Sequence, residues 1–387
     1  MPELNAAQIR NFRLQAHHLH AACSKADIPA LVGACGMQNT PPGAWETALY
    51  NRAPACSLLE MEQLLACDRS LLQAWSFRGA PFVFPANESA VFLSPLAAQE
   101  GEPWVYTPGI LLALDFLQLP FDELFERLKQ VMPQLDEHTI VSKSTLDQTL
   151  AEWMLPLLPA QKRSLWNSPS MYGSPDKQTV GGAVVSFLLR PCAFSGLVVF
   201  GAREGISPTF TSYKNWLGRP LATDGEAPQK LVRKFLHCYG PATLDSFVSW
   251  LGCSRAQGQR LWRSAAEEME PVTVLGKKGY ILSADKERLL SPVPLQRELL
   301  LLGGHDPYLD QRDRSILLPS PPLQRRVWQT ISNPGAVVRQ GAIIGTWTSK
   351  KKARGINIQM TLWAEPPAKQ ALCDLAEGYA AFGSKRS

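Results

Sequence analysis

Three long polar side chains recur on one side of a helical pattern in the second half of the chain. Arg255, Gln259 and Arg263 follow an i, i+4, i+8 spacing and therefore share a helix face, while Leu261 and Ala265 occupy another face. Guanidinium groups bind phosphate oxygens well. The pattern predicts a helix that buries one side and offers the other to a nucleic acid.

A hairpin with two lysines follows this helix. The strand-like runs Pro271–Leu275 and Tyr280–Leu282 flank the turn Gly276–Gly279, which places Lys277 and Lys278 at the hairpin tip. Ammonium groups at an exposed tip are suited to contact the DNA backbone.

Two more helical runs come before these elements. The first ends at a Gly-Pro pair, and the second, Leu244–Leu251, can be capped by Thr243, as Ser254 can cap the third. Three helices and a basic hairpin are the order of a winged helix, whose third helix and wing meet the major groove and its flanking phosphates. Such units also serve as packing or protein-contact modules, and this alternative stays open.

A run of histidines near the N-terminus raises the question of a metal site. The expected helix Asn5–Ala22 carries His17, His18 and His20, with Cys23 beyond. His18 and His20 do not share a helix face, and no second ligand pair follows at zinc-site spacing. The pattern favours a solvated helix end, and we expect no metal and no cofactor.

Length and composition indicate a protein of several domains. The 387 residues predict roughly two to four domains. Apolar residues make up 45% and charged residues 19%, which provides ample core and argues against disorder. The net charge of +5 fits a partner that carries phosphates without requiring one.

The cysteine pattern indicates a reducing compartment. None of the eight cysteines forms a C-x-x-C pair, and most lie in apolar helical runs, so we expect reduced core residues. No stretch is apolar for long enough to span a membrane, and no secretion signal begins the chain. We expect a cytoplasmic protein associated with the nucleoid.

The order of elements predicts a mainly α fold with β hairpins, of the α+β class. Three tandem winged-helix units are expected at 1–115, 116–222 and 223–292, followed by a small β-rich domain at 293–387 that a terminal helix closes.

Each part carries cations that we expect to contact DNA. In the first unit, Leu71–Pro85 is expected to form a helix end, a turn with Arg78, and a strand; in the second unit, Arg203 lies in a hairpin tip. In the last domain, a basic run lies between two expected strands, where it could bind phosphate or protect a strand edge. This run comprises Lys350, Lys351, Lys352 and Arg354.

Several blocks of the sequence, in one order, resemble the AlkZ/YcaQ-like family of winged-helix DNA glycosylases. The resemblance runs nearly from end to end. The blocks are GMQNTPP at 36–42, DRSLLQAWSFRGAPFVFP at 68–85, PTFTSYKNWLG at 208–218, YGPATLDSFVSWLG at 239–252, HDPYLDQRDRS at 305–315, RRVWQ at 325–329 and GAIIGTW at 341–347.

We expect a monomer that binds double-stranded DNA, alkylated or crosslinked, and the resemblance implies that the DNA lies in a concave channel. The resemblance also implies hydrolysis of the N-glycosidic bond of bulky or crosslinked N-alkylated purines. The family holds the attacking water with a Gln-x-Gln or Gln-x-Asp motif, which matches Gln38, Asn39 and Thr40. Thr40 replaces the second acceptor and is no base at neutral pH. Phe82 stands where many relatives have a histidine.

Several alternatives stay open. Gln38 could instead satisfy nearby backbone groups. Asp306, Tyr308 and Arg314 could face the channel or form internal hydrogen bonds. The chain could also be a catalytically inactive or altered DNA-binding or regulatory protein of the same fold, or a protein-interaction scaffold. Salt-sensitive binding would separate the scaffold from the others.

Overall fold

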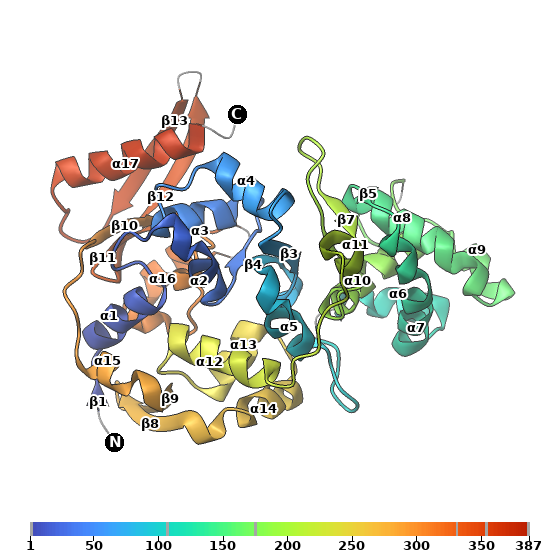
Figure 1. Ribbon diagram of the computed structural model, residues 1–387, viewed down its shortest axis with the longest axis horizontal. Coiled ribbons are helices and arrows are strands. Elements are labelled where there is room, and N and C mark those ends of the chain that lie inside the picture. Colours follow the sequence, from blue (N-terminus) through green and yellow to red (C-terminus); the bar gives the residue numbers. More distant parts are fainter. Residues whose placement is uncertain (1–2, 106–107, 174–175, 330–331, 353–354, 385–387) are drawn as a thin grey trace.

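The computed structural model describes residues 3–105, 108–173, 176–329, 332–352 and 355–384, with the side chains of 351, 352 and 355 left out (Figure 1). It is 51% helix and 17% strand in small sheets, which confirms the mainly α class with β hairpins. The described residues contain no helix that is both long and apolar enough to cross a membrane.

The first part of the chain surrounds a three-stranded antiparallel sheet in the order β2-β4-β3. Its elements are β1 (Glu3–Leu4), α1 (Ala6–Ala16), α2 (Ile28–Gly33), β2 (Met37–Gln38), α3 (Ala44–Arg52), α4 (Leu58–Ala66), β3 (Leu71–Trp75), β4 (Pro81–Pro85) and α5 (Ser89–Leu93). The expected helix end at Leu71 is wrong, because β3 pairs with β4 along its whole length and buries four of its five residues.

The N-terminal helix is shorter than expected. It ends at Ala16, and His18 has a φ of 55°, which breaks the helix. His17 is only 1% exposed. The expectation of a solvated helix end is therefore wrong for His17, which the chain turns into the core.

The middle part lies to one side of the rest of the molecule, at the right of Figure 1. It comprises α6 (Leu111–Leu117), α7 (Phe121–Val131), β5 (Ile140–Val141), α8 (Lys143–Met154), α9 (Arg163–Trp166), α10 (Val180–Phe194), β6 (Val199–Phe200), β7 (Thr209–Thr211) and α11 (Tyr213–Leu217), with the sheet order β5-β7-β6. Trp75 of β3 stacks on Phe210 with ring centroids 5.4 Å apart, so aromatic packing joins the two parts.

The third part has the predicted elements α12 (Ala227–Tyr239), α13 (Leu244–Leu251), α14 (Arg255–Arg263), β8 (Met269–Val274) and β9 (Lys277–Leu282), followed by α15 (Lys286–Leu290). Thr243 and Ser254 cap α13 and α14 as expected. The turn is Leu275-Gly276, with φ of 47° and 77°, rather than Gly276–Gly279, so the two lysines begin β9. Strand β1 pairs in parallel with β8 and completes this sheet.

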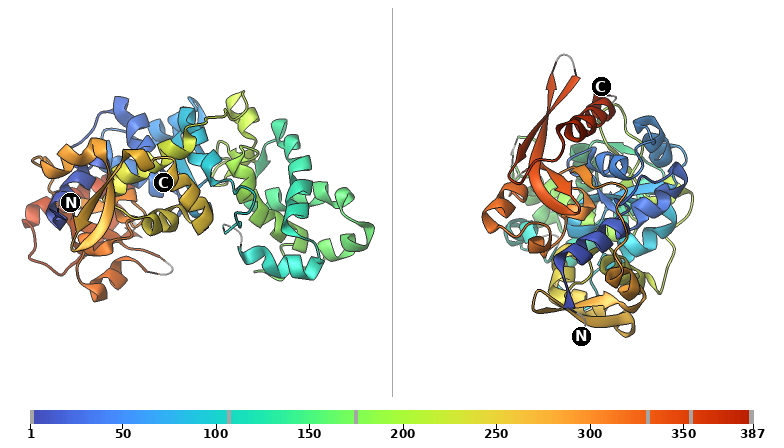
Figure 2. Two further views of the ribbon diagram at one scale, coloured as in Figure 1. Left: turned by 90° about the horizontal axis from the view of Figure 1, so that it is seen from below. Right: turned by 90° about the vertical axis from the view of Figure 1, so that its left-hand side faces the viewer.

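The last part is a four-stranded antiparallel sheet in the order β10-β11-β12-β13. The elements are β10 (Leu299–Leu302), α16 (Pro321–Val327), β11 (Gly335–Arg339), β12 (Ala342–Lys352), β13 (Gly355–Leu362) and the closing helix α17 (Lys369–Ser384). The β12–β13 hairpin projects from the body beside α17 (Figure 2).

Two buried arginines join the N-terminal helices to the later parts. Arg13 is fully buried and donates to the backbone oxygens of Tyr239, Gly240 and Pro241 and to both carboxylate oxygens of Asp313. Each of these bonds stabilises the interface between segments distant in sequence.

The second arginine, Arg52, forms a two-bond pair with Asp306 at 2.9 and 3.0 Å, and both side chains are buried. The pair fixes the loop 303–314 against α3. Asp306 also accepts from the amide of Tyr308, whose hydroxyl donates to the oxygen of Gly341. Internal hydrogen bonding is therefore the role of these two residues, and of the two alternatives for them it is the one confirmed.

Candidate active site

Gln38 lies at the end of the short strand β2, opposite Phe82 of β4, and is partly exposed. Its amide nitrogen Nε2 donates to the backbone oxygen of Thr40 at 3.3 Å and lies 3.4 Å from Nδ1 of His305. Its Oε1 accepts from Nη2 of Arg78 at 3.3 Å. These contacts fix the direction in which the amide faces and leave Oε1 with one further lone pair.

Arg78 connects Gln38 to the third and last parts of the chain. The same Nη2 atom donates to Oδ2 of Asp310 at 2.8 Å, and Nη1 donates to the backbone oxygen of Trp250. Arg78 has a φ of 55° in the turn between β3 and β4. Its side chain is only 25% exposed, and its guanidinium donates to protein groups.

A glycine of the third part makes room for this arginine. Gly252, the residue after α13, has a φ of 72°. A Cβ atom at this position would come within 2.6 Å of Cγ of Arg78. The predicted end of α13 at Gly252 thus also controls how Arg78 reaches Gln38.

His305 and Asp310 are the functional candidates that sequence reasoning missed. Both lie in the block HDPYLDQRDRS, from which Asp306, Tyr308 and Arg314 were considered instead. Asp310 accepts from Arg78 and, at 3.4 Å, from Arg312. A polar loop of alternating acids and bases was the available signal. Sequence alone gives no reason to prefer one aspartate of this loop over another.

Burial keeps His305 neutral. Burial lowers the pKa of this histidine, and of the two nearby charges Asp310 opposes the shift while Arg78 adds to it. A neutral imidazole can accept the Gln38 amide proton at Nδ1, whereas an imidazolium would repel it. The orientation of Gln38 therefore depends on His305 remaining neutral.

Asn39 and Thr40, the other two residues of the motif, have different hydrogen-bonding roles. Asn39 is 4% exposed, donates to Oε1 of Gln73 at 3.0 Å and accepts from the amide of Gly43 at 2.7 Å, so it holds the start of α3. Thr40 is exposed, and its backbone oxygen accepts a hydrogen bond from Nε2 of Gln38. Of the two predicted catalytic residues, only Gln38 has its side chain in the cluster with Arg78, His305 and Asp310.

A cavity of about 460 Å³ borders this cluster, between the wing of the third part and the loop after Asp310. Four cations and two carboxylates line it: Lys277, Lys278, Arg312, Arg314, Asp310 and Asp313. The two predicted wing lysines are thus brought to the same place as Asp310. The guanidinium of Arg314 lies 4.8 Å from the ring centroid of Trp328.

The remaining predicted DNA contacts are spread over the surface. Arg255, Gln259 and Arg263 are exposed on α14, and Arg255 pairs with Asp245. In Figure 1, α14 lies at the bottom of the view and the β12–β13 hairpin, where Lys350 is exposed, lies at the top. The side chains of Lys351 and Lys352, and Arg354, lie outside the described residues.

Arg203 lies exposed in the hairpin between β6 and β7, near Ile206, which is 98% exposed. A hollow of about 610 Å³ separates this hairpin from α3 and α4, and Arg203 and Pro42 both line it. Arg203 and the segment that follows Thr40 therefore border the same hollow.

Comparisons with known proteins place the chain in a family. The family described as "DNA glycosylase AlkZ-like" matches residues 31–382. The "Interstrand DNA cross-link repair glycosylase" of Streptomyces sahachiroi is 24% identical over 354 residues, which covers 88% of this chain and 86% of that protein. The solved structure of the Streptomyces sahachiroi DNA glycosylase AlkZ has a TM-score of 0.77 and 23% identity, with 100% of this chain and 98% of that chain covered. This last likeness shows a shared fold.

Proposed function

Because the chain belongs to the DNA glycosylase AlkZ-like family, we propose that it hydrolyses the N-glycosidic bond of bulky or crosslinked N-alkylated purines in double-stranded DNA. The observation that carries the proposal is the Gln38 amide, oriented by Arg78 and His305 beside the Asp310 carboxylate. N-alkylation makes the purine a cationic leaving group, and bond cleavage develops positive charge on the sugar. The protein then has to hold a water with hydrogen-bond acceptors on the far face of that sugar.

Gln38 and Asp310 supply acceptors of two kinds. Oε1 of Gln38 is neutral and fixed, which suits it to orient the water. The Asp310 carboxylate carries the charge that Thr40 lacks, so it can accept the water proton and stabilise the cationic sugar. Thr40, at the family's second acceptor position, adds at most a hydrogen bond from its hydroxyl.

The cationic side chains around the cluster are suited to bind the DNA backbone. Lys277 and Lys278 line the cavity next to Asp310, and Arg263 is exposed on α14. We propose that these groups, with Arg203 and Lys350, contact phosphates, and that the protein acts as a monomer without a cofactor.

A second function is a DNA-binding or regulatory protein of the same fold that lacks glycosylase activity. Two observations favour it. Thr40 stands in the place of an acceptor, and Oε1 of Gln38 already accepts from Arg78, which leaves less capacity for a water.

Single-turnover release of N7-alkylguanine from duplex DNA separates the two functions. Simple and bulky adducts are compared, with Gln38→Ala as the variant. Release by the wild type that disappears in Gln38→Ala supports the glycosylase. No release, with duplex binding that weakens steeply as salt rises, refutes the glycosylase and supports the second function.

A further inference from the structure

Three potential metal ligands meet in the core, close to the candidate active site. They are His17, directly after α1; Cys35, between α2 and β2; and Cys238 in α12, and each is buried. Their ligand atoms all lie within 4.8 Å of one another. Within the described ranges, this is the only group of three or more such residues.

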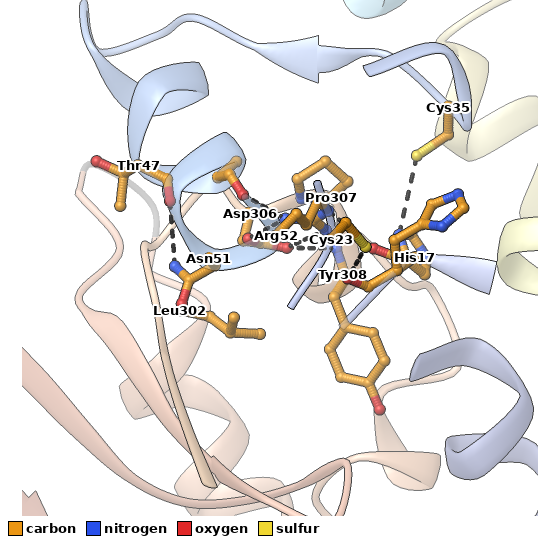
Figure 3. Close-up of polar contacts among 12 residues, drawn as sticks. His17, Cys23, Cys35, Thr47, Asn51, Arg52, Leu302, Asp306, Pro307 and Tyr308 are labelled. Atoms are coloured by element: carbon orange, nitrogen blue, oxygen red, sulfur yellow. Dashed lines mark hydrogen bonds and ion pairs between the residues drawn. The ribbon is translucent and has the colours of Figure 1, made fainter. Parts of the chain in front are cut away.

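The distance between Cys35 and His17, both drawn in Figure 3, is close to that between two ligands of one metal ion. The figure shows the Cys35 sulfur directed toward the His17 ring, and the distance from Sγ to Nδ1 is 3.9 Å. A tetrahedral zinc ion holds a sulfur and a nitrogen ligand roughly 3.5 Å apart, given its bond lengths. A shift of a few tenths of an ångström would therefore be enough to bring both onto one ion.

The second nitrogen of His17 sets its tautomer. Nε2 lies 3.0 Å from the backbone oxygen of Cys238, which can only accept, so Nε2 carries the proton. Nδ1 then keeps its lone pair directed at Cys35. An imidazole whose other nitrogen donates to a carbonyl is the usual orientation of a metal-ligating histidine.

Polar groups lie close to the Cys35 sulfur. The Tyr239 hydroxyl lies 3.6 Å from the Cys35 sulfur. Arg52, next to the cluster in Figure 3, pairs with Asp306 and donates from Nε to the backbone oxygen of His17.

We propose that His17 Nδ1, Cys35 Sγ and Cys238 Sγ bind one zinc ion. Binding replaces the two thiol protons, which are released to solvent, with two sulfur–metal bonds. Two thiolates and an imidazole supply three of the four positions of a tetrahedral Zn²⁺ site. The site joins the end of α1, the segment before β2 and helix α12. Its role is structural, because the three ligands are closed off from solvent.

The test uses the full-length protein expressed in minimal medium with cobalt replacing zinc. Tetrahedral Co²⁺ bound to thiolates gives a near-ultraviolet charge-transfer band, and elemental analysis gives the metal content per chain. We expect close to one cobalt per chain with this band. Cys35→Ser should lose both, whereas Cys192→Ser, which alters a fully buried cysteine elsewhere, should keep both.

Three outcomes would overturn the proposal. One is wild-type protein with the band absent and far less than one metal per chain. Another is a folded Cys35→Ser or His17→Gln variant that retains the metal. The third is a Cys35–Cys238 disulfide, found by mass analysis of protein from a reducing cytoplasm. If the variants fail to fold, the wild-type metal content and band still decide, and they do not depend on glycosylase activity.

Discussion

Replacing Asp310 with asparagine tests the chemistry of the candidate site most directly. Asparagine has nearly the same shape, and its oxygen can still accept from Arg78, so the arrangement around Gln38 should persist. What disappears is the negative charge and the ability to take a proton. We expect Asp310→Asn to lower the rate of base release by about 100-fold or more, in the range of a lost general base.

The cost in stability should be small by comparison. The Arg78 and Asp310 side chains are 25% and 26% exposed, so solvent screens their ion pair only in part. Asparagine keeps the hydrogen bond from Arg78 and removes the charge, and a hydrogen bond to a charged group contributes about 1.5–3 kcal/mol against about 0.5–1.5 kcal/mol for a neutral one. The free energy of unfolding in urea should therefore fall by about 1–2 kcal/mol.

The assay is single-turnover release of an N7-alkylguanine at saturating protein. Saturation matters because removing an acid beside phosphates should tighten DNA binding. Asp313→Asn is the matched control, because it removes the same charge three positions away. Asp313 pairs with the buried Arg13, so this control should lose about 1–3 kcal/mol of stability while its folded fraction keeps the wild-type rate.

A rate for Asp310→Asn within about threefold of wild type would refute the role of this carboxylate, since a lost general base costs far more. Equal rate losses in Asp310→Asn and Asp313→Asn would also refute it, because loop charge rather than position would then explain the effect.

Four further predictions concern other parts of the molecule. Thr40→Gln should raise the rate of base release, since a longer acceptor returns to the family position; an unchanged single-turnover rate would show that no acceptor is needed there. Arg263→Gln should weaken duplex binding for all sequences and reduce the salt slope of log K by about 1, as fluorescence anisotropy would show; an unchanged slope would place this arginine off the DNA. Gly252→Ala should lower the unfolding free energy by about 1 kcal/mol or more, because of its φ of 72°, and slow base release by displacing Arg78; a wild-type rate would contradict the link between α13 and the site. Burial lowers the pKa of His18 to about 4, so the unfolded chain binds more protons between pH 6.5 and 4 and stability should fall over that range as pH drops; in urea titrations His18→Asn should flatten this dependence, and an unaltered slope would assign it to other groups.

Sequence patterns were sufficient where local rules decide the structure. The caps Thr243 and Ser254 and the end of α13 follow from side-chain chemistry within a few residues. The division of the chain into four units, with boundaries at 115, 222 and 292, stays a prediction.

Contacts between distant segments could not be predicted in this way. Leu71–Trp75 is a strand because β4 pairs with it, and His17 is buried because Cys238 and Tyr239 lie against it. The motif directed attention to Gln38, but Asp310 reaches it only through Arg78, across more than two hundred residues of chain. Tertiary packing, which a pattern does not contain, selects one aspartate of the loop from its neighbours.

The parallel pairing of β1 with β8 has a consequence for how the protein folds during synthesis. Glu3 and Leu4 lie beside Thr273 and Val274, so this strand leaves the ribosome long before its partner is made. At about 5–20 residues per second, this delay is on the order of tens of seconds. Throughout it, the apolar face of α1 and the guanidinium of Arg13 lack their final neighbours, which makes the nascent N-terminus a natural client for chaperones.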